Sequence, residues 1–236
     1  MKLVLPTAII GLLVYSLLDT LWITLSGQQF ILATFILNLC LWLICFLLFR
    51  MGFLGKKEIY LKRFGKAAYR KAFFRFLLPY SIFWWGAASM PLWVPGERIL
   101  RLIPFSILGA IFIALAGLFI IKTQVVFGMD YFAFTHFYFP QEAKLVTSKI
   151  FGFIRHPIYT AWIYLGIGFF LIRGSLTSLA SAIVNITVIC VLSEMEERDI
   201  IKYFKEDYRA YKNSVPPFFP KKPVAFLKFL LAKDKK

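Results

Sequence analysis

The sequence predicts an all-α polytopic membrane protein with about six transmembrane helices, and two observations lead to this prediction. Of the 236 residues, 60% are hydrophobic and only 17% are charged, whereas a soluble domain averages about 45–50% apolar and about 25% charged residues. The apolar residues also form long uncharged runs, and about 18 such residues suffice to cross a hydrocarbon core about 30 Å thick. A water-soluble globule could not bury this much apolar surface.

Six runs of the sequence have the composition of a membrane span. The first, 3–26, is interrupted only by Asp19. The others carry no charged residue and are 29–49, 76–96, 102–121, 157–172 and 174–193. We expect a single membrane domain over residues 1–236, in which the region 1–121 forms a four-span N-terminal bundle.

The net charge of +16 is explained by orientation in the membrane. Cytoplasmic loops collect Lys and Arg, and six spans with both termini in the cytoplasm place 25 of the 28 basic residues on that side. The other three are Arg98, Arg101 and Arg173. Such cations can bind anionic headgroups, so we predict membrane lipids as partners and no nucleic acid.

Two basic segments on the predicted cytoplasmic side resemble surface helices. Residues 55–71 and 223–236 mix aromatic and aliphatic side chains with lysines and arginines, as amphipathic helices at a membrane surface do. Solvated basic loops are the alternative interpretation. Cys40, Cys45 and Cys190 all fall within predicted spans, so we expect neither a disulfide framework nor a metal site.

The first cluster of residues suited to binding or catalysis stands at the beginning of the fifth predicted span. Its sequence is Arg155-His156-Pro157-Ile158-Tyr159. Proline is favoured at the first helical position. A helix that begins there presents free N–H groups and partial positive charge to an anionic group. The alternative is that Arg155 anchors the membrane edge and His156 caps the helix.

A second cluster, Glu194, Glu196 and Glu197, follows the sixth predicted span. Glu196 lies on the same predicted helix stripe as Ile200, Phe204 and Tyr208, where a carboxylate needs a cationic or hydrogen-bonding partner. The alternative is that the acids complement a helix dipole. Because the two clusters bracket one hairpin, we expect them to meet at one membrane boundary and to form a pocket with a polar mouth and an apolar floor.

At these residues the chain resembles the superfamily of isoprenylcysteine carboxyl methyltransferases and phospholipid methyltransferases. The resemblance covers residues 144–220. Its elements share the order and spacing of that family and are Leu145-Val146, Arg155-His156-Pro157-Ile158-Tyr159, Glu196-Glu197, Phe204, Tyr208, Tyr211 and Val215-Pro216.

The resemblance implies a methyltransferase that uses S-adenosyl-L-methionine, bound at the cytoplasmic face, and a lipid-like or small apolar acceptor. The residues it assigns to the cofactor site, with their immediate neighbours, are Leu145, Val146, Phe151, Arg155, His156, Pro157, Ile158, Tyr159, Glu196 and Glu197. The acceptor group, whether carboxylate, amine or thiol, stays open, as does the general base, for which Asp130, His136 and Glu197 are candidates by sequence proximity. Asp19 is a possible substrate contact or a helix-to-helix hydrogen bond.

The chain departs from the family pattern at four places. Phe151 stands where the family has Tyr, and Lys149 and Lys205 stand where it has Gly. Leu192 replaces an Arg that the isoprenylcysteine enzymes use to meet the substrate carboxylate, which argues against a prenylcysteine substrate. Two other hypotheses follow: a nicotinamide-dependent sterol-type membrane reductase of related architecture, and a non-catalytic relative.

Overall fold

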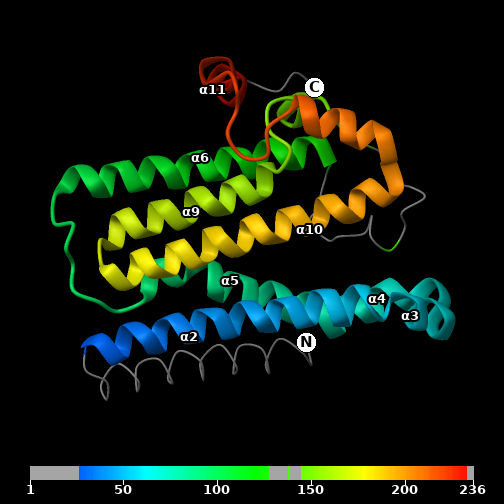
Figure 1. The fold of residues 1–236 in the computed structure, drawn as a ribbon, viewed down its shortest axis with the longest axis horizontal. Coiled ribbons are helices and arrows are strands. Elements are labelled where there is room, and N and C mark those ends of the chain that lie inside the picture. Colours follow the sequence, from blue (N-terminus) through cyan, green and yellow to red (C-terminus); the bar gives the residue numbers. More distant parts are fainter. Residues whose placement is uncertain (1–26, 128–137, 139–144, 233–236) are drawn as a thin grey trace. The chain divides into compact units, whose positions relative to one another are not determined.

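The computed structural model describes residues 27–127, 138 and 145–232 (Figure 1). Within these residues most of the chain is helical and no strand is formed, apart from an isolated bridge between Arg98 and Ser175. The predicted all-α class is therefore confirmed for this part of the chain. The predicted span 3–26, with Asp19, and the residues Asp130 and His136 lie outside the described residues.

The structure describes twelve helical elements among these residues. Their bounds are α2 (Gly27–Phe46), η1 (Leu47–Leu54), α3 (Lys57–Phe64), η2 (Gly65–Ala67), α4 (Ala68–Ala72), η3 (Phe73–Leu77), α5 (Leu78–Trp93), α6 (Ile103–Phe127), η5 (Lys149–Gly152), α9 (Pro157–Arg173), α10 (Leu176–Ser214) and α11 (Pro223–Leu231).

Three of these helical segments are long and apolar enough to cross a membrane: Ile31–Leu54, Ile103–Val126 and Leu176–Ser214. The helices α5 and α9 also coincide with predicted spans but have 16 and 17 residues, so the count of six spans stays a prediction. With 39 residues, α10 is longer than the roughly 20 residues that a bilayer core needs. Its uncharged part ends at Ser193, and we treat the part from Glu194 onward as lying outside the hydrocarbon.

The chain folds as two compact units, and each is described separately. The first comprises Met1–Ile107 and Phe169–Asn185, and the second comprises Leu108–Gly168 and Ile186–Lys236. The boundaries fall inside α6, α9 and α10.

In the first unit, a side-chain amide replaces a backbone hydrogen bond that is missing from α5. Pro91 lies inside α5 and has no N–H, so the carbonyl of Ala87, four residues earlier, loses its helical partner. Asn185 of α10 donates its Nδ2 to the carbonyls of Ala87 and Ala88, each at 3.1 Å. Its Oδ1 accepts a 2.8 Å hydrogen bond from Trp42 Nε1 on α2. The buried amide thereby satisfies backbone that hydrocarbon cannot.

The predicted surface helix at 55–71 is broken in two. Gly65 has φ 51° and ψ −126°, a conformation that glycine adopts readily and other residues do not. It ends α3, and the short η2 turn leads into α4.

In the second unit, α6 packs closely on α9 and supports α11. A Cβ placed on Gly168 would lie 2.8 Å from the carbonyl oxygen of Gly109, so only glycine permits this approach. Phe119 of α6 stacks on Phe226 of α11 at 5.6 Å between ring centroids. Residues 223–231 of the predicted surface helix are thus helical, with Phe226 and Leu230 buried, and the position of α11 at the cytoplasmic membrane surface stays a prediction.

Candidate functional site

The start of α9 is joined to the segment that follows α10. The backbone N–H of Arg155 donates to the carbonyl of Pro216 at 2.9 Å, and that of His156 donates to Pro217 at 3.0 Å. The Thr160 hydroxyl also lies 3.3 Å from the carbonyl of Phe218. Two parts of the motif some 60 residues apart in sequence are therefore held together by backbone.

Glu197 is the buried centre of the site, with 1% of its surface exposed. Its Oε1 lies 2.8 Å from Arg155 Nε and 2.7 Å from His156 Nε2. Its Oε2 lies 2.6 Å from Lys212 Nζ. The predicted meeting of the Arg-His cluster with the glutamate pair thus occurs in the structure, through Glu197.

Arg155 is buried as well, with 7% of its side chain exposed. In addition to Glu197, its guanidinium donates to the carbonyl of Lys212 at 2.9 Å and to the carbonyl of Val215. A cation with this many internal acceptors is a structural tie between α9 and α10 and does not serve as a membrane-edge anchor.

The charges around Glu197 set its protonation. Burial alone would raise its pKa, but hydrogen bonds from His156, Lys212 and Arg155 outweigh burial and lower the pKa to about 2. In turn, the hydrogen bond to Glu197 raises the pKa of Lys212. A general base works best with a pKa near the working pH, so the structure argues against Glu197 in that role.

The neighbouring carboxylate is shifted in the opposite direction. Burial raises the pKa of Glu196, and the nearby charge of Glu197 adds to this, although His156 and a hydrogen bond with Tyr159 act against it. Glu196 is half-buried, whereas 51% of the side chain of Glu194 is exposed. Two adjacent carboxylates with opposite shifts are suited to different tasks.

The remaining predicted site residues lie around this cluster. Phe151 is buried in η5, and its carbonyl accepts a 2.7 Å hydrogen bond from the Tyr211 hydroxyl. Burial raises the pKa of that hydroxyl, so it acts as a donor. Leu145 and Val146 are half-buried in the segment before η5. Pro157 and Ile158 lie in the first turn of α9. The first helical hydrogen bond there runs from the backbone N–H of Thr160 to the carbonyl of His156, at 2.8 Å.

Two of the departures from the family pattern have an unusual backbone. Lys149 has φ 55° and Lys205 has φ 44°, and they are the two non-glycine residues with positive φ among the residues described. Both stand where the family has Gly, so the chain keeps a glycine-like conformation without the glycine. The break at Lys205, with ψ −120°, interrupts α10. The i, i+4 stripe therefore does not run unbroken from Glu196 to Tyr208, and the carboxylate that is fully buried is Glu197.

Lys212 and the backbone carbonyls of residues 212 and 215–217 were not among the site residues predicted from the sequence. Lys212 sits one turn after Tyr208 on the last part of α10. A buried carboxylate needs cationic partners. Applied to Glu197 rather than to Glu196, this rule could have pointed to Lys212.

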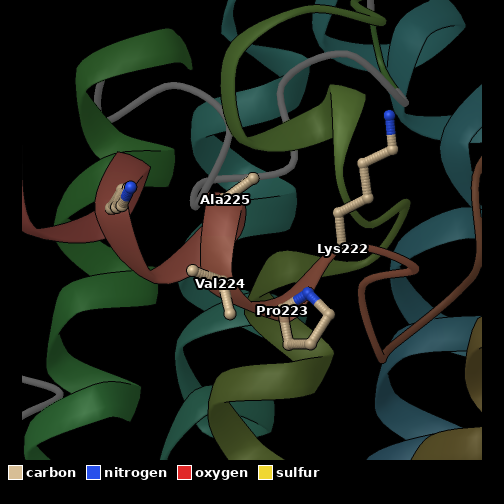
Figure 2. A pocket seen from close by; sticks show the side chains of 5 residues that line it. Lys222, Pro223, Val224 and Ala225 are labelled. Atoms are coloured by element: carbon tan, nitrogen blue, oxygen red, sulfur yellow. The ribbon is translucent and has the colours of Figure 1, made fainter.

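A cavity of about 420 Å³ lies apart from this cluster, at the beginning of α11 (Figure 2). Its lining consists of Lys222, Pro223, Val224, Ala225 and Lys228. None of these is a predicted site residue, and the described part of the lining has no carboxylate, histidine or hydroxyl group. We therefore take the Glu197 cluster as the candidate site. No group of three or more potential metal ligands of the His, Cys, Asp and Glu types occurs among the described residues.

These features define a helical membrane protein with a buried Arg-His-Glu cluster where two helices meet. The phospholipid methyltransferase family model matches residues 105–207. The chain is 26% identical over 148 residues to a methanethiol S-methyltransferase of Crocosphaera subtropica, covering 59% of this chain and 55% of that protein. It is 34% and 32% identical over 77 residues to the protein-S-isoprenylcysteine O-methyltransferases of Xenopus laevis and Homo sapiens, covering 32% of this chain and 27% of each relative.

The predicted resemblance to this superfamily of membrane methyltransferases is thereby confirmed. The matches span about half of the first relative and about a quarter of the other two. No solved structure gives a significant match.

Proposed function

We propose that this chain is an S-adenosyl-L-methionine-dependent methyltransferase whose methyl donor binds beside the Glu197 cluster. The observation that carries the proposal is the 2.7 Å contact between His156 Nε2 and Glu197 Oε1, because it joins the two halves of the methyltransferase motif across 41 residues of sequence. The positive-inside rule supports a cytoplasmic position for this site.

The residues present fit the donor. Glu196 is half-buried and its carboxylate lies beside Tyr159, which suits the ammonium or sulfonium charge of the donor. The first turn of α9 offers N–H groups and a positive dipole end to a carboxylate. Arg155 and Glu197 are occupied by each other, so their proposed role is to support the residues that touch the donor.

When bound, S-adenosyl-L-methionine supplies an electrophilic methyl group on a sulfonium, which is transferred by in-line displacement. The work of the chain is then mainly to orient the reactants. Glu197 occupies Nε2 of His156, which fixes the ring and leaves Nδ1 for another contact. Leu145, Val146 and Phe151 supply apolar surface near the motif, with Pro157 and Ile158 shaping the helix start.

We further propose an acceptor that is lipid-like or small and apolar and has no carboxylate. Leu192, which is half-buried, provides no cation where the isoprenylcysteine enzymes have Arg, and an uncompensated charge at this depth is costly. The relatives include a protein named for methanethiol, so a long-chain alkyl thiol is a suitable first acceptor. Transfer of labelled methyl to the thiol but not to a prenylcysteine is expected, and the reverse preference would refute this assignment.

Calorimetric titration of the full chain in detergent tests the class of cofactor. We expect binding of S-adenosyl-L-methionine or its demethylated product, and none of NADPH. Binding of NADPH alone would establish the reductase, which the matches to methyltransferases do not favour. Folded protein that binds neither would identify a non-catalytic relative.

A further inference from the structure

Three buried oxygen atoms on α2 and α10, within the first unit, have no hydrogen-bond partner. They are Thr34 Oγ1, Asn38 Oδ1 and Ser181 Oγ, on residues with 3%, 0% and 2% of their surface exposed. Nearly all buried polar atoms in proteins are hydrogen-bonded, and an unpaired group in an apolar region is expensive. Three together therefore need a physical explanation.

The two helices bring these atoms to one place. Asn38 Nδ2 donates to the carbonyl of Ser181 at 3.4 Å, and Trp42 Nε1 donates to Asn185 Oδ1 at 2.8 Å. Both contacts join residues 143 apart, so α2 and α10 run parallel in a fixed register.

Thr34 lies one turn before Asn38 and on the same face of α2. The Cβ of Ser181 tilts toward the beginning of α10, which is the level of Thr34. The three oxygens therefore lie within about one helical turn, roughly 5.4 Å, of each other along the contact between the helices.

The two hydroxyls differ from others in the chain. Thr123 and Ser81 each donate to the carbonyl four residues earlier, at 2.8 Å and 2.9 Å, which is the usual way for a helix to satisfy a hydroxyl. Thr34 and Ser181 do not use this option. Both hydroxyls therefore keep their hydrogen-bonding capacity for a partner other than the helix backbone.

We propose that this spot binds one water molecule within the membrane-embedded part of the first unit. Asn38 Oδ1 only accepts, while the two hydroxyls both donate and accept. A water can therefore donate to Asn38 and exchange hydrogen bonds with Thr34 and Ser181. Three polar partners are the usual number for a buried water. Neither α2 nor residues 176–193 of α10 contain an acidic residue, so these two helices offer no counter-charge to a metal cation.

The test is a double-mutant cycle on the full chain in detergent, with Thr34→Val, Ser181→Ala and the double variant. With water present, each single substitution removes one of its partners, and the melting temperature falls by about 2–4 °C. The double variant loses clearly less than the sum, because the water is already lost. Thr187→Val, at an exposed position of α10, is the control and leaves the melting temperature unchanged.

If the site holds no water, the substitutions do not lower the melting temperature. Replacing unpaired hydroxyls with apolar groups then leaves the melting temperature unchanged or raises it, which overturns the proposal. Density from an experimental structure provides a check independent of folding. A peak within hydrogen-bond distance of all three oxygens supports the proposal, and empty density refutes it.

Discussion

Two polar centres are buried to the same degree in this chain and are built differently. Glu197 and Asn185 are each 1% exposed, and each contacts residues far away in sequence. Glu197 is ionised and is surrounded by Arg155, His156 and Lys212. Asn185 is neutral and repairs the helix that contains Pro91. A neutral amide is thus enough to hold helices together in the first unit, whereas the second unit holds them with a buried charge.

The largest expected effect comes from removing the charged centre. Glu197→Ala leaves Arg155 buried without its counter-charge, and removing one partner of a buried pair typically costs about 3–5 kcal/mol. Thermal unfolding in detergent measures the loss. The matched control is Glu194→Ala, whose carboxylate is 51% exposed and whose removal costs at most about 1 kcal/mol. Equal losses of unfolding free energy in the two variants would show that the Glu197 cluster does not stabilise the fold.

Low pH affects the stability contributed by the two centres differently, and this difference can be measured without a mutation. The pKa of Glu197 is lowered to about 2, below the ordinary value of about 4.5. Its stabilisation is therefore complete above pH 4.5 and is lost as the pH falls toward 2. The loss amounts to about 3 kcal/mol. We expect unfolding scans of the wild type to show this loss and scans of Glu197→Gln to show less of it. The same acid dependence in both proteins would contradict the assignment.

Breaking the neutral centre has a smaller effect. Asn185→Leu leaves the carbonyl of Ala87 and the N–H of Trp42 without their partner, which costs about 1–3 kcal/mol. Restoring the N–H to α5 with Pro91→Ala should recover part of the loss, because the helix then satisfies the carbonyl itself. Fully additive effects of the two substitutions would contradict the repair of α5 by Asn185.

The smallest effects concern the backbone and have opposite signs. Gly65 and Lys205 share one conformation, with φ/ψ of 51°/−126° and 44°/−120°. Lys205→Gly is expected to stabilise by about 1 kcal/mol and Gly65→Ala to destabilise by a similar amount. A Cβ at Gly65 would meet nothing within 4 Å, so the effect there comes from the backbone alone. Two changes of the same sign, measured by thermal unfolding, would rule out this explanation.

Sequence patterns predicted the helices well where the signal was local. The five uncharged runs from residue 29 onward coincide with helices in the structure, three of which are long and apolar enough to cross a membrane, and Pro157 marked the beginning of α9. The sequence also predicted that the Arg-His cluster contacts the glutamates, because the two ends of a helical hairpin lie on the same side of the membrane. The helical stripe failed to identify Glu197 as the most buried acid, because Glu197 is buried by Arg155 and His156, which come from a distant part of the sequence. Lys212 and the carbonyls that hold Arg155 depend on tertiary contacts that no local pattern contains.

The central claim is that the methyl donor binds beside Glu196 at the Arg-His-Glu cluster. Its most direct test is calorimetric titration of S-adenosyl-L-homocysteine into the wild type, Glu196→Ala and Glu194→Ala, each shown to be folded by its melting temperature. We predict that the wild type and Glu194→Ala bind equally well and that Glu196→Ala binds at least about tenfold more weakly, a loss of about 1.4 kcal/mol. Unchanged affinity in Glu196→Ala, or no binding by the folded wild type, would contradict the account.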